Sequence, residues 1–278
     1  MKLAVSDKQF VGSIPSIYEE YLVPLIFEAY AQKMAETVML FKPKYVLELA
    51  AGTGVATKAL SNISADLSLI ATDLNQDMLD QAKLKCSSEN VVWQQADALD
   101  LPFADNVFDL VMCQFGVMFF PDKIKAYREV LRVLKPGGKF IFSVWDNLNH
   151  NTLAKTVTQA LAFLYPNNPP SFLARVPYAY AKKERISEDL IKAGFSNKID
   201  FLLEKEVSSA ASASIPAIAY CQGTPLRLEI EKLGSVSLAQ ATEYVTESII
   251  KKLGSGEIVS QIQAYLVCAT FNENDRSS

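Results

Sequence analysis

The sequence is poor in the residues that usually build metal sites and disulfide frameworks. Its 278 residues include one histidine and four cysteines, which stand far apart as Cys86, Cys113, Cys221 and Cys268. No two of them have the C-x-x-C spacing that is typical of zinc sites and redox motifs. We therefore predict no metal site and no disulfide framework. Cys113 and Cys268 lie in apolar runs and are expected to be small core residues.

Long apolar runs and clusters of positive charge are also missing. The first residues, MKLAVSDKQFVG, contain no apolar stretch typical of a signal peptide, and no run approaches membrane-spanning length. The formal net charge is -4 and no block of Lys and Arg stands out, which disfavours a nucleic-acid partner. Half of the residues are apolar, enough for a sizeable core. The sequence thus predicts a cytoplasmic protein with no membrane and no nucleic acid as partner.

Short apolar runs alternate with segments of helical spacing in the first half of the chain. A helical region is predicted at 15–40. The predicted strands lie at 45–50, 67–73, 91–95, 108–113 and 139–145. The predicted helices between them run from the turn after the first strand to about 62, from 76 to 86, and from Pro121-Asp122 to the stop at Pro136-Gly137-Gly138. Strands that alternate with helices imply a parallel sheet covered on both faces.

The rhythm changes after Trp145. Residues 187–194 (SEDLIKAG) are expected to form a short capped helix, a strand follows near 198–207, and 262–271 closes the chain as a strand.

No linker separates two bodies, so we predict a single domain over residues 1–278. Its parts are an N-terminal helical lid at 1–40, a core at 41–146, and helical insertions at 147–184 and 208–256.

The turn Glu48-Leu49-Ala50-Ala51-Gly52-Thr53-Gly54 lies between a predicted strand and a predicted helix. Glycines there let the backbone turn tightly and let a ligand approach its N–H groups. Dinucleotide enzymes use the same device, but the third position of their fingerprint falls here on Val55 or Thr57, which are neither Gly nor Ala. A nicotinamide-dependent oxidoreductase is therefore the second enzymatic interpretation.

Acidic residues follow the next two strands. Asp73 ends the second strand, where a carboxylate can accept hydrogen bonds from both hydroxyls of a ribose. Asp97, followed by Ala98, comes after the third strand, where a carboxylate can accept a hydrogen bond from an adenine amino group. Each also has an ordinary interpretation, as a helix cap or as a loop residue.

Together these residues resemble the class I, Rossmann-like methyltransferases, above all the small-molecule group that includes the ubiquinone and menaquinone C-methyltransferases. The resemblance covers residues 15–145 and rests on VLELAAGTG, Asp73, QADALDLPFADNVFDLV, FFPD and LRVLKPGGKF. It implies a mostly parallel seven-stranded sheet with helices on both faces, an antiparallel last strand and a helical cover. It also implies S-adenosylmethionine as the cofactor.

The resemblance further implies which residues hold that cofactor. Glu48 would anchor the turn near the methionine end, and the remaining expected contacts are Tyr21, Ala50, Gly52, Gly54, Asp73, Leu74, Met78, Asp97, Ala98 and Gln114. Asp73 would bind the ribose, and Leu74 and Met78 would flank the adenine. Gln114 would face the methionine portion. Tyr18 and Tyr21 lie on the first helices. Each could either cover the ligands or pack in the core, and the sequence does not decide between these alternatives. The chain departs from the family at Ala50-Ala51, where glycines are frequent.

The only histidine, His150, follows the fifth strand, where related enzymes shape the acceptor pocket. It is the candidate general base, with an ordinary loop histidine as the alternative. Methyl transfer from a sulfonium depends mainly on alignment, and a base is needed only if the acceptor loses a proton.

The insertions are rich in Ala, Ser, Leu and Tyr, which suits an apolar or aromatic small-molecule acceptor. Whether O, N or C is methylated stays open, as do the oligomeric state and a catalytically silent, regulatory alternative.

Overall fold

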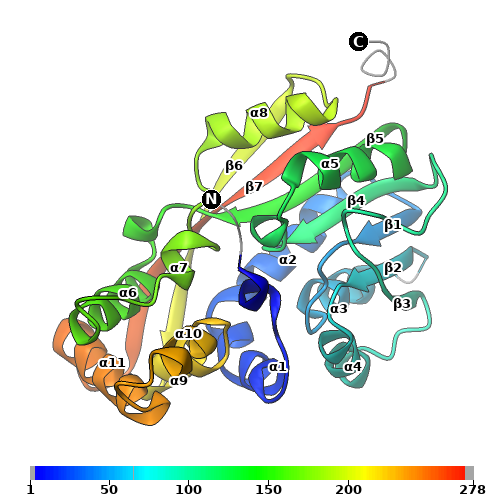
Figure 1. Ribbon diagram of the computed structural model, residues 1–278. Helices are drawn as coiled ribbons and strands as arrows, with labels where there is room; N and C mark the ends of the chain where they lie inside the picture. Colours follow the sequence, from blue (N-terminus) through cyan, green and yellow to red (C-terminus); the bar gives the residue numbers. More distant parts are fainter. Residues whose placement is uncertain (1–3, 65, 273–278) are drawn as a thin grey trace.

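A seven-stranded sheet forms the centre of the computed structural model, which describes residues 4–64 and 66–272 (Figure 1). The strand order is β3-β2-β1-β4-β5-β7-β6. The strands are β1 (Tyr45–Glu48), β2 (Ser68–Asp73), β3 (Val91–Gln95), β4 (Phe108–Gln114), β5 (Leu134–Trp145), β6 (Ile199–Ala210) and β7 (Ile258–Thr270). Strands β1 to β5 pair in parallel, and β7 is antiparallel to both of its neighbours. The predicted fold class is confirmed.

Helices cover both faces of this sheet. On one face pack α2 (Glu28–Met39) and α3 (Val55–Ile63), and on the other α5 (Lys123–Val133) and α8 (Lys183–Ala193). Helix α4 (Gln76–Lys85) lies beside β2 and β3. Successive strand residues point to opposite faces, so a strand buried on both sides reads as a continuous apolar run. This is why the parallel strands were visible in the sequence.

The N-terminal region is helical, as predicted, but not uniformly so. A short 3₁₀-helix, η1 (Val5–Lys8), and α1 (Ile14–Ile17) precede a π-helix, η2 (Tyr18–Phe27), which leads into α2. Pro24 lies inside η2 and lacks the amide proton that a regular α-helix needs there. A π-helix has i→i+5 hydrogen bonds, so residues 18–27 do not follow the helical spacing assumed from the sequence.

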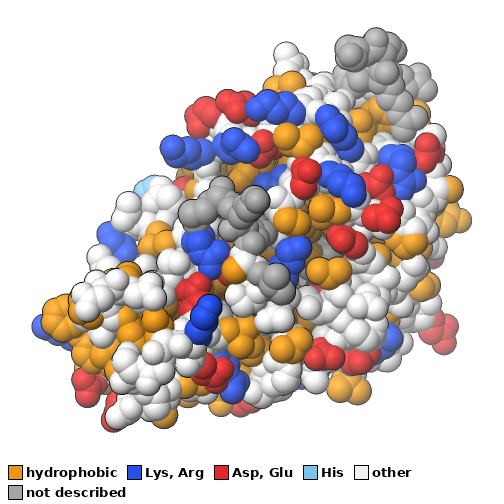
Figure 2. Space-filling model, in the orientation of Figure 1, with side chains coloured by type: hydrophobic (Ala, Val, Ile, Leu, Met, Phe, Trp, Pro, Cys, Tyr) orange, Lys and Arg blue, Asp and Glu red, His pale blue; other side chains and the backbone are white. Residues whose placement is uncertain are grey.

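The remaining helices form a cover at one end of the long strands β6 and β7 (Figure 1). The cover consists of η4 (Leu148–His150), α6 (Thr152–Leu164), α7 (Phe172–Arg175), α9 (Ser214–Gln222), α10 (Leu226–Leu233) and α11 (Leu238–Leu253). Strand β6 runs to residue 210, so the second insertion begins later than predicted. In the described ranges, no helix is both long and apolar enough to cross a membrane. The face drawn in Figure 2 intersperses Lys and Arg with Asp and Glu.

The start of α8 differs from the sequence prediction. The helix begins at Lys183, so Ser187 lies inside it and caps nothing. The Ser-Glu-Asp pattern resembled a cap, but the buried stripe of Ile186 and Leu190 requires the earlier start. Gly194, with φ 110°, ends the helix as expected.

The turns that follow β1 and β4 touch each other. A Cβ atom on Gly116, just before the short helix η3 (Val117–Phe119), would lie 2.5 Å from the Cβ of Ala50 and 2.6 Å from the Sγ of Cys113. Neither atom belongs to the far end of a flexible side chain. Only glycine therefore permits this approach.

We predict that Gly116→Ala lowers the free energy of unfolding by about 1–3 kcal/mol, because the added methyl group forces the two turns apart. The measurement is equilibrium unfolding in urea. Gly256→Ala is the matched control, since nothing lies within 4 Å of its Cβ position. Equal stability of the two variants would show that the contact between the turns is not constrained.

Candidate functional site

The order of the strands reverses between β1 and β4. From β1 the chain proceeds outward through β2 and β3, and β4 and β5 then build the other side. In such sheets the ligand crevice lies outside the carboxyl ends of the strands at this switch point. A cavity opens there, and the residues that line it come from the carboxyl ends of β1 to β5, from the N-terminal helices and from the helical cover.

Two residues beside the cavity have a left-handed backbone although neither is glycine. Ala50, after β1, and Phe115, after β4, both have φ 51°. This conformation costs about 1–2 kcal/mol for a residue with a Cβ atom, and such strain clusters at functional sites. Ala50 therefore takes up the backbone conformation for which the family often uses glycine.

Gly52 and Gly54 serve different purposes. Gly52 (φ 57°) lines the cavity, and nothing lies within 4 Å of the position that its Cβ would occupy. Gly54 (φ 83°) is not among the lining residues, and its Cβ would lie 2.7 Å from the ring of Trp93 on β3. The close approach that glycine permits at Gly54 is therefore to Trp93, and its contact with a ligand stays a prediction.

Glu48 anchors the turn from beneath. Its side chain is buried and accepts a hydrogen bond of 2.5 Å from the hydroxyl of Thr57 on α3. Burial raises the pKa of Glu48 from its ordinary value of 4.5 to about 8. Thr57 is one of the positions where a dinucleotide fingerprint has Gly or Ala, and here its hydroxyl is used to hold the turn.

Asp73 lies in the cavity wall at the end of β2. One carboxylate oxygen accepts from the amide of Gly52 at 2.9 Å and the other from the amide of Asn75 at 2.8 Å. Burial raises the pKa of Asp73, and the amide hydrogen bonds oppose that shift. Asp97 lies farther out, at the exposed rim, and accepts from the amide of Leu99 at 2.9 Å.

Gln114, at the end of β4, contributes an acceptor without a partner. Its Nε2 donates to the carbonyl of Phe27 at 3.3 Å. Its Oε1 is buried, and among the described residues no group hydrogen-bonds to it. Because Gln114 lines the cavity, an ammonium group bound there would satisfy this oxygen.

The other predicted contacts divide into those at the cavity and one elsewhere. Leu74, Met78 and Ala98 line it, whereas Tyr21 does not. Tyr18 lines it instead and stacks on Phe27, with ring centroids 5.3 Å apart. The reason is the π-helix, which shifts the face that a given residue presents.

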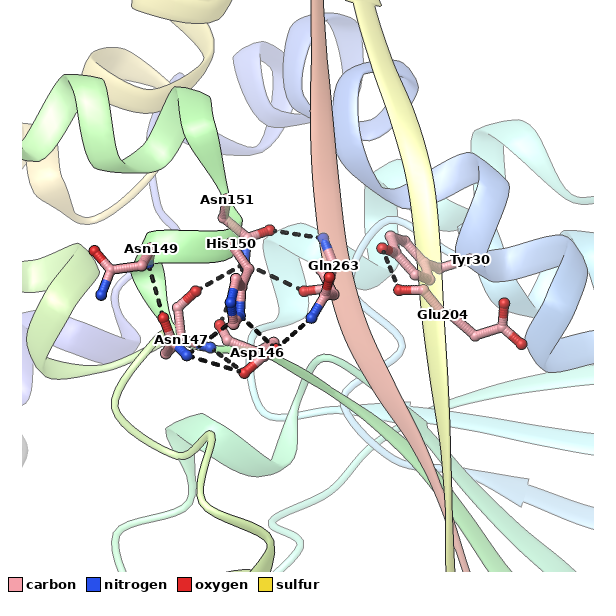
Figure 3. Close-up of polar contacts among 8 residues, drawn as sticks. All are labelled: Tyr30, Asp146, Asn147, Asn149, His150, Asn151, Glu204 and Gln263. Atoms are coloured by element: carbon pink, nitrogen blue, oxygen red, sulfur yellow. Dashed lines mark hydrogen bonds and ion pairs between the residues drawn. The ribbon is translucent and has the colours of Figure 1, made fainter.

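His150 lies outside the lining of the cavity. Its ring is 51% exposed, and its Nδ1 lies 2.7 Å from the buried carboxylate of Asp146, which also accepts from Nε2 of Gln263 at 2.5 Å (Figure 3). Asn151 bonds the backbone of Gln263 in both directions. The network fastens the loop after β5 to β7, and a role of His150 as general base stays a prediction.

An aromatic wall completes the cavity, and the sequence pattern did not indicate it. Phe115 and Trp145 stack with centroids 4.0 Å apart, and Phe27 lies 5.9 Å from Trp145. Tyr178 and Tyr220 join the wall from the helical cover. The position of Trp145 at a strand end was a signal, but the two tyrosines come from segments without a motif.

The comparisons with known proteins agree with this geometry. The methyltransferase domain family matches residues 47–142. The ubiquinone/menaquinone biosynthesis C-methyltransferase UbiE of Shewanella sediminis is 37% identical over 115 residues, 40% of this chain and 46% of that enzyme. The demethylmenaquinone methyltransferase of Lactiplantibacillus plantarum is 32% identical over 181 residues, 60% of this chain and 76% of that enzyme. The chain belongs to the class I S-adenosylmethionine-dependent methyltransferases.

Proteins with little sequence identity to this methyltransferase have the same fold. The solved YcgJ protein of Bacillus subtilis superposes with a TM-score of 0.55 at 21% identity, over 88% of this chain and 99% of that one. The match to the Shewanella enzyme spans about half the length of that enzyme.

The buried carboxyl group of Glu48 makes the stability of this methyltransferase depend on pH. Between pH 4.5 and about 8 the folded protein holds a proton that the unfolded chain has released. The free energy of unfolding therefore falls as the pH rises through this window. We predict a loss of about 2 kcal/mol between pH 6 and pH 8 that Glu48→Gln does not show.

Urea unfolding at the two pH values measures this difference, with the exposed Glu89→Gln as control. Parallel behaviour of wild type and Glu48→Gln would mean that Glu48 is ionised in the folded protein.

Proposed function

We propose that this chain transfers the methyl group of S-adenosylmethionine to an apolar or aromatic small molecule in the switch-point cavity. The observation that carries the proposal is the composition of that one cavity. It joins a wall suited to a nucleoside, with Asp73 and Asp97, to an aromatic wall around Trp145. Gln114, whose buried Oε1 has no hydrogen-bond partner among the described residues, lines the same cavity.

The cofactor-binding roles follow from those positions. Asp73 accepts hydrogen bonds from the ribose hydroxyls. Asp97 and Ala98 contact the edge of the adenine, and Leu74 and Met78 contact its two faces. Oε1 of Gln114 accepts from the ammonium group of the methionine portion. When bound, S-adenosylmethionine supplies a methyl group that is already activated by the positive charge on sulfur.

The protein contributes alignment and the exclusion of water. Holding two reactants in line can lower the activation free energy by about 7–11 kcal/mol. The aromatic wall contributes to this alignment because it restricts the orientations that a flat acceptor can adopt. Aromatic faces also attract a positively charged sulfur. Because the relatives are named for ubiquinone, menaquinone and demethylmenaquinone, a reduced quinone ring is the acceptor class we propose first.

Residues of the N-terminal region form a lid over this site in our proposal. Lys8, Phe10 and Tyr18 line the cavity. Asp7, whose side chain is 1% exposed, forms two hydrogen bonds with the guanidinium of Arg175, which also pairs with Glu229 at 2.7 Å. This buried ion cluster ties the first residues of the lid to α7 and α10.

We predict that Arg175→Met speeds the dissociation of S-adenosylhomocysteine by about tenfold, because a buried Asp7 without its partner favours the open lid. Stopped-flow tryptophan fluorescence measures the rate. The control is Lys192→Met, which removes an exposed ion pair with Glu188 on α8. Identical dissociation rates in both variants would show that the ion cluster does not hold a lid.

Cofactor binding has a direct test in Asp73→Ala. Hydrogen bonds to a charged acceptor contribute about 1.5–3 kcal/mol, so the affinity for S-adenosylhomocysteine should fall by about 10- to 100-fold in calorimetry. Asp80→Ala, an exposed change on the neighbouring helix, should bind as the wild type does. Unchanged affinity in a folded Asp73→Ala protein would remove this residue from the site, and tighter binding of NADH by the wild type would favour an oxidoreductase.

A further inference from the structure

Two tyrosines of the helical cover stand in the cavity wall without a role in holding the cofactor. Tyr178 follows α7 and Tyr220 belongs to α9, and both line the cavity. Their side chains are 6% and 2% exposed. They therefore add two side chains with hydroxyl groups to a wall that is otherwise largely apolar.

The hydroxyl of Tyr220 interacts with the hydroxyl of Tyr178, which acts as the donor and leaves the Tyr220 proton unused. The Tyr220 hydroxyl is buried, and among the described residues no group accepts a hydrogen bond from it. The backbone next to it is fixed, because the carbonyl of Tyr220 accepts from the hydroxyl of Thr224 at 2.8 Å. Burial raises the pKa of Tyr220 to about 12, so the hydroxyl keeps its proton at neutral pH. A buried donor of this kind is usually satisfied by a ligand or by water.

Tyr178 lies beside it and connects it to the aromatic wall. The ring of Tyr178 lies 5.8 Å from that of Trp145, which stacks on Phe115. Burial and the neighbouring Tyr220 hydroxyl raise the pKa of Tyr178 well above its usual range, so it too is a neutral hydroxyl. A flat ring against Trp145 would thus meet a hydrogen-bond donor at the side of the helical cover.

We propose that Tyr220 donates a hydrogen bond to an oxygen substituent of an aromatic acceptor, such as a phenol, naphthol or hydroquinone, and that Tyr178 positions the Tyr220 hydroxyl. This inference rests on the proposed function, since it assigns the acceptor end of the same cavity. The Tyr220 hydroxyl would favour an aromatic ring that carries an oxygen substituent over the same ring without one. The selectivity arises because a bare ring leaves the buried hydroxyl unsatisfied.

The test compares two probes of the same ring system, 1-naphthol and naphthalene, by titrating tryptophan fluorescence of the full chain with and without S-adenosylhomocysteine. The wild type should bind 1-naphthol at least tenfold more tightly than naphthalene. Tyr220→Phe should lower the affinity for 1-naphthol about tenfold and leave the affinities for naphthalene and S-adenosylhomocysteine unchanged.

Two further variants separate positioning from packing. Tyr178→Phe should weaken 1-naphthol binding in the wild type but not in the Tyr220→Phe background, because its effect acts through Tyr220. The control is Tyr165→Phe, because Tyr165 is buried but does not line the cavity. This variant should bind both probes as the wild type does.

Equal affinity of the wild type for the two probes would overturn the inference, as would a folded Tyr220→Phe that binds 1-naphthol normally. Failure of S-adenosylhomocysteine to bind would instead refute the proposed function, and the titrations without it would still decide on Tyr220.

Discussion

The contact between the turns that follow β1 and β4 is the constraint on which the site depends. Gly116 lies so close to Ala50 that no side chain fits between them. This approach accompanies the left-handed conformations of Ala50 and Phe115, on either side of the switch point. The first places Gly52 at the cavity, and the second places an aromatic ring against Trp145. One junction therefore holds both the wall around Gly52 and the aromatic wall around Trp145.

Electrostatics within that junction favour a neutral carboxyl group beneath the turn. Glu48 is buried beneath the turn, is bonded to Thr57, and has a raised pKa. Asp73 is stabilised by two backbone amides at the surface of the cavity. Two carboxyl groups near each other are easier to accommodate when one keeps its proton. Glu48 thus supports the turn as a structural acid, while two backbone amides fix Asp73 at the cavity.

The core of the fold could be predicted because its signals are local. Apolar runs such as 45–50 mark strands through burial, and the structure has these strands close to the predicted positions. The predicted helix stop at Pro136-Gly137-Gly138 was too late, because α5 ends at Val133 and these residues lie inside β5. Ala50, Gly52, Asp73 and Gln114 follow strand ends, and parallel strands bring their ends together. These four residues line one cavity for this reason.

What could not be predicted depends on contacts between distant segments or on irregular backbone. Tyr21 was expected at the ligands, but the π-helix at 18–27 brings Tyr18 there instead. Gly54 was expected to admit the cofactor, and its close approach to Trp93, from another strand, was not predicted. The carboxylate of Asp146, which pairs with His150 four residues later, also accepts from Gln263 on β7, a contact between distant segments. Tyr220 carries no motif, and its place in the cavity follows from the packing of the helical cover.

The most direct test of the account is transfer of a labelled methyl group from S-adenosylmethionine to a panel of hydroquinones, naphthols and catechols, with the Asp73→Ala protein as control. The account predicts that label appears in at least one aromatic product, with one S-adenosylhomocysteine formed per methyl group transferred, and that the control is much slower at low cofactor concentration. Tight binding of S-adenosylmethionine with no transfer to any member of the panel would contradict it and would favour a catalytically silent, regulatory protein.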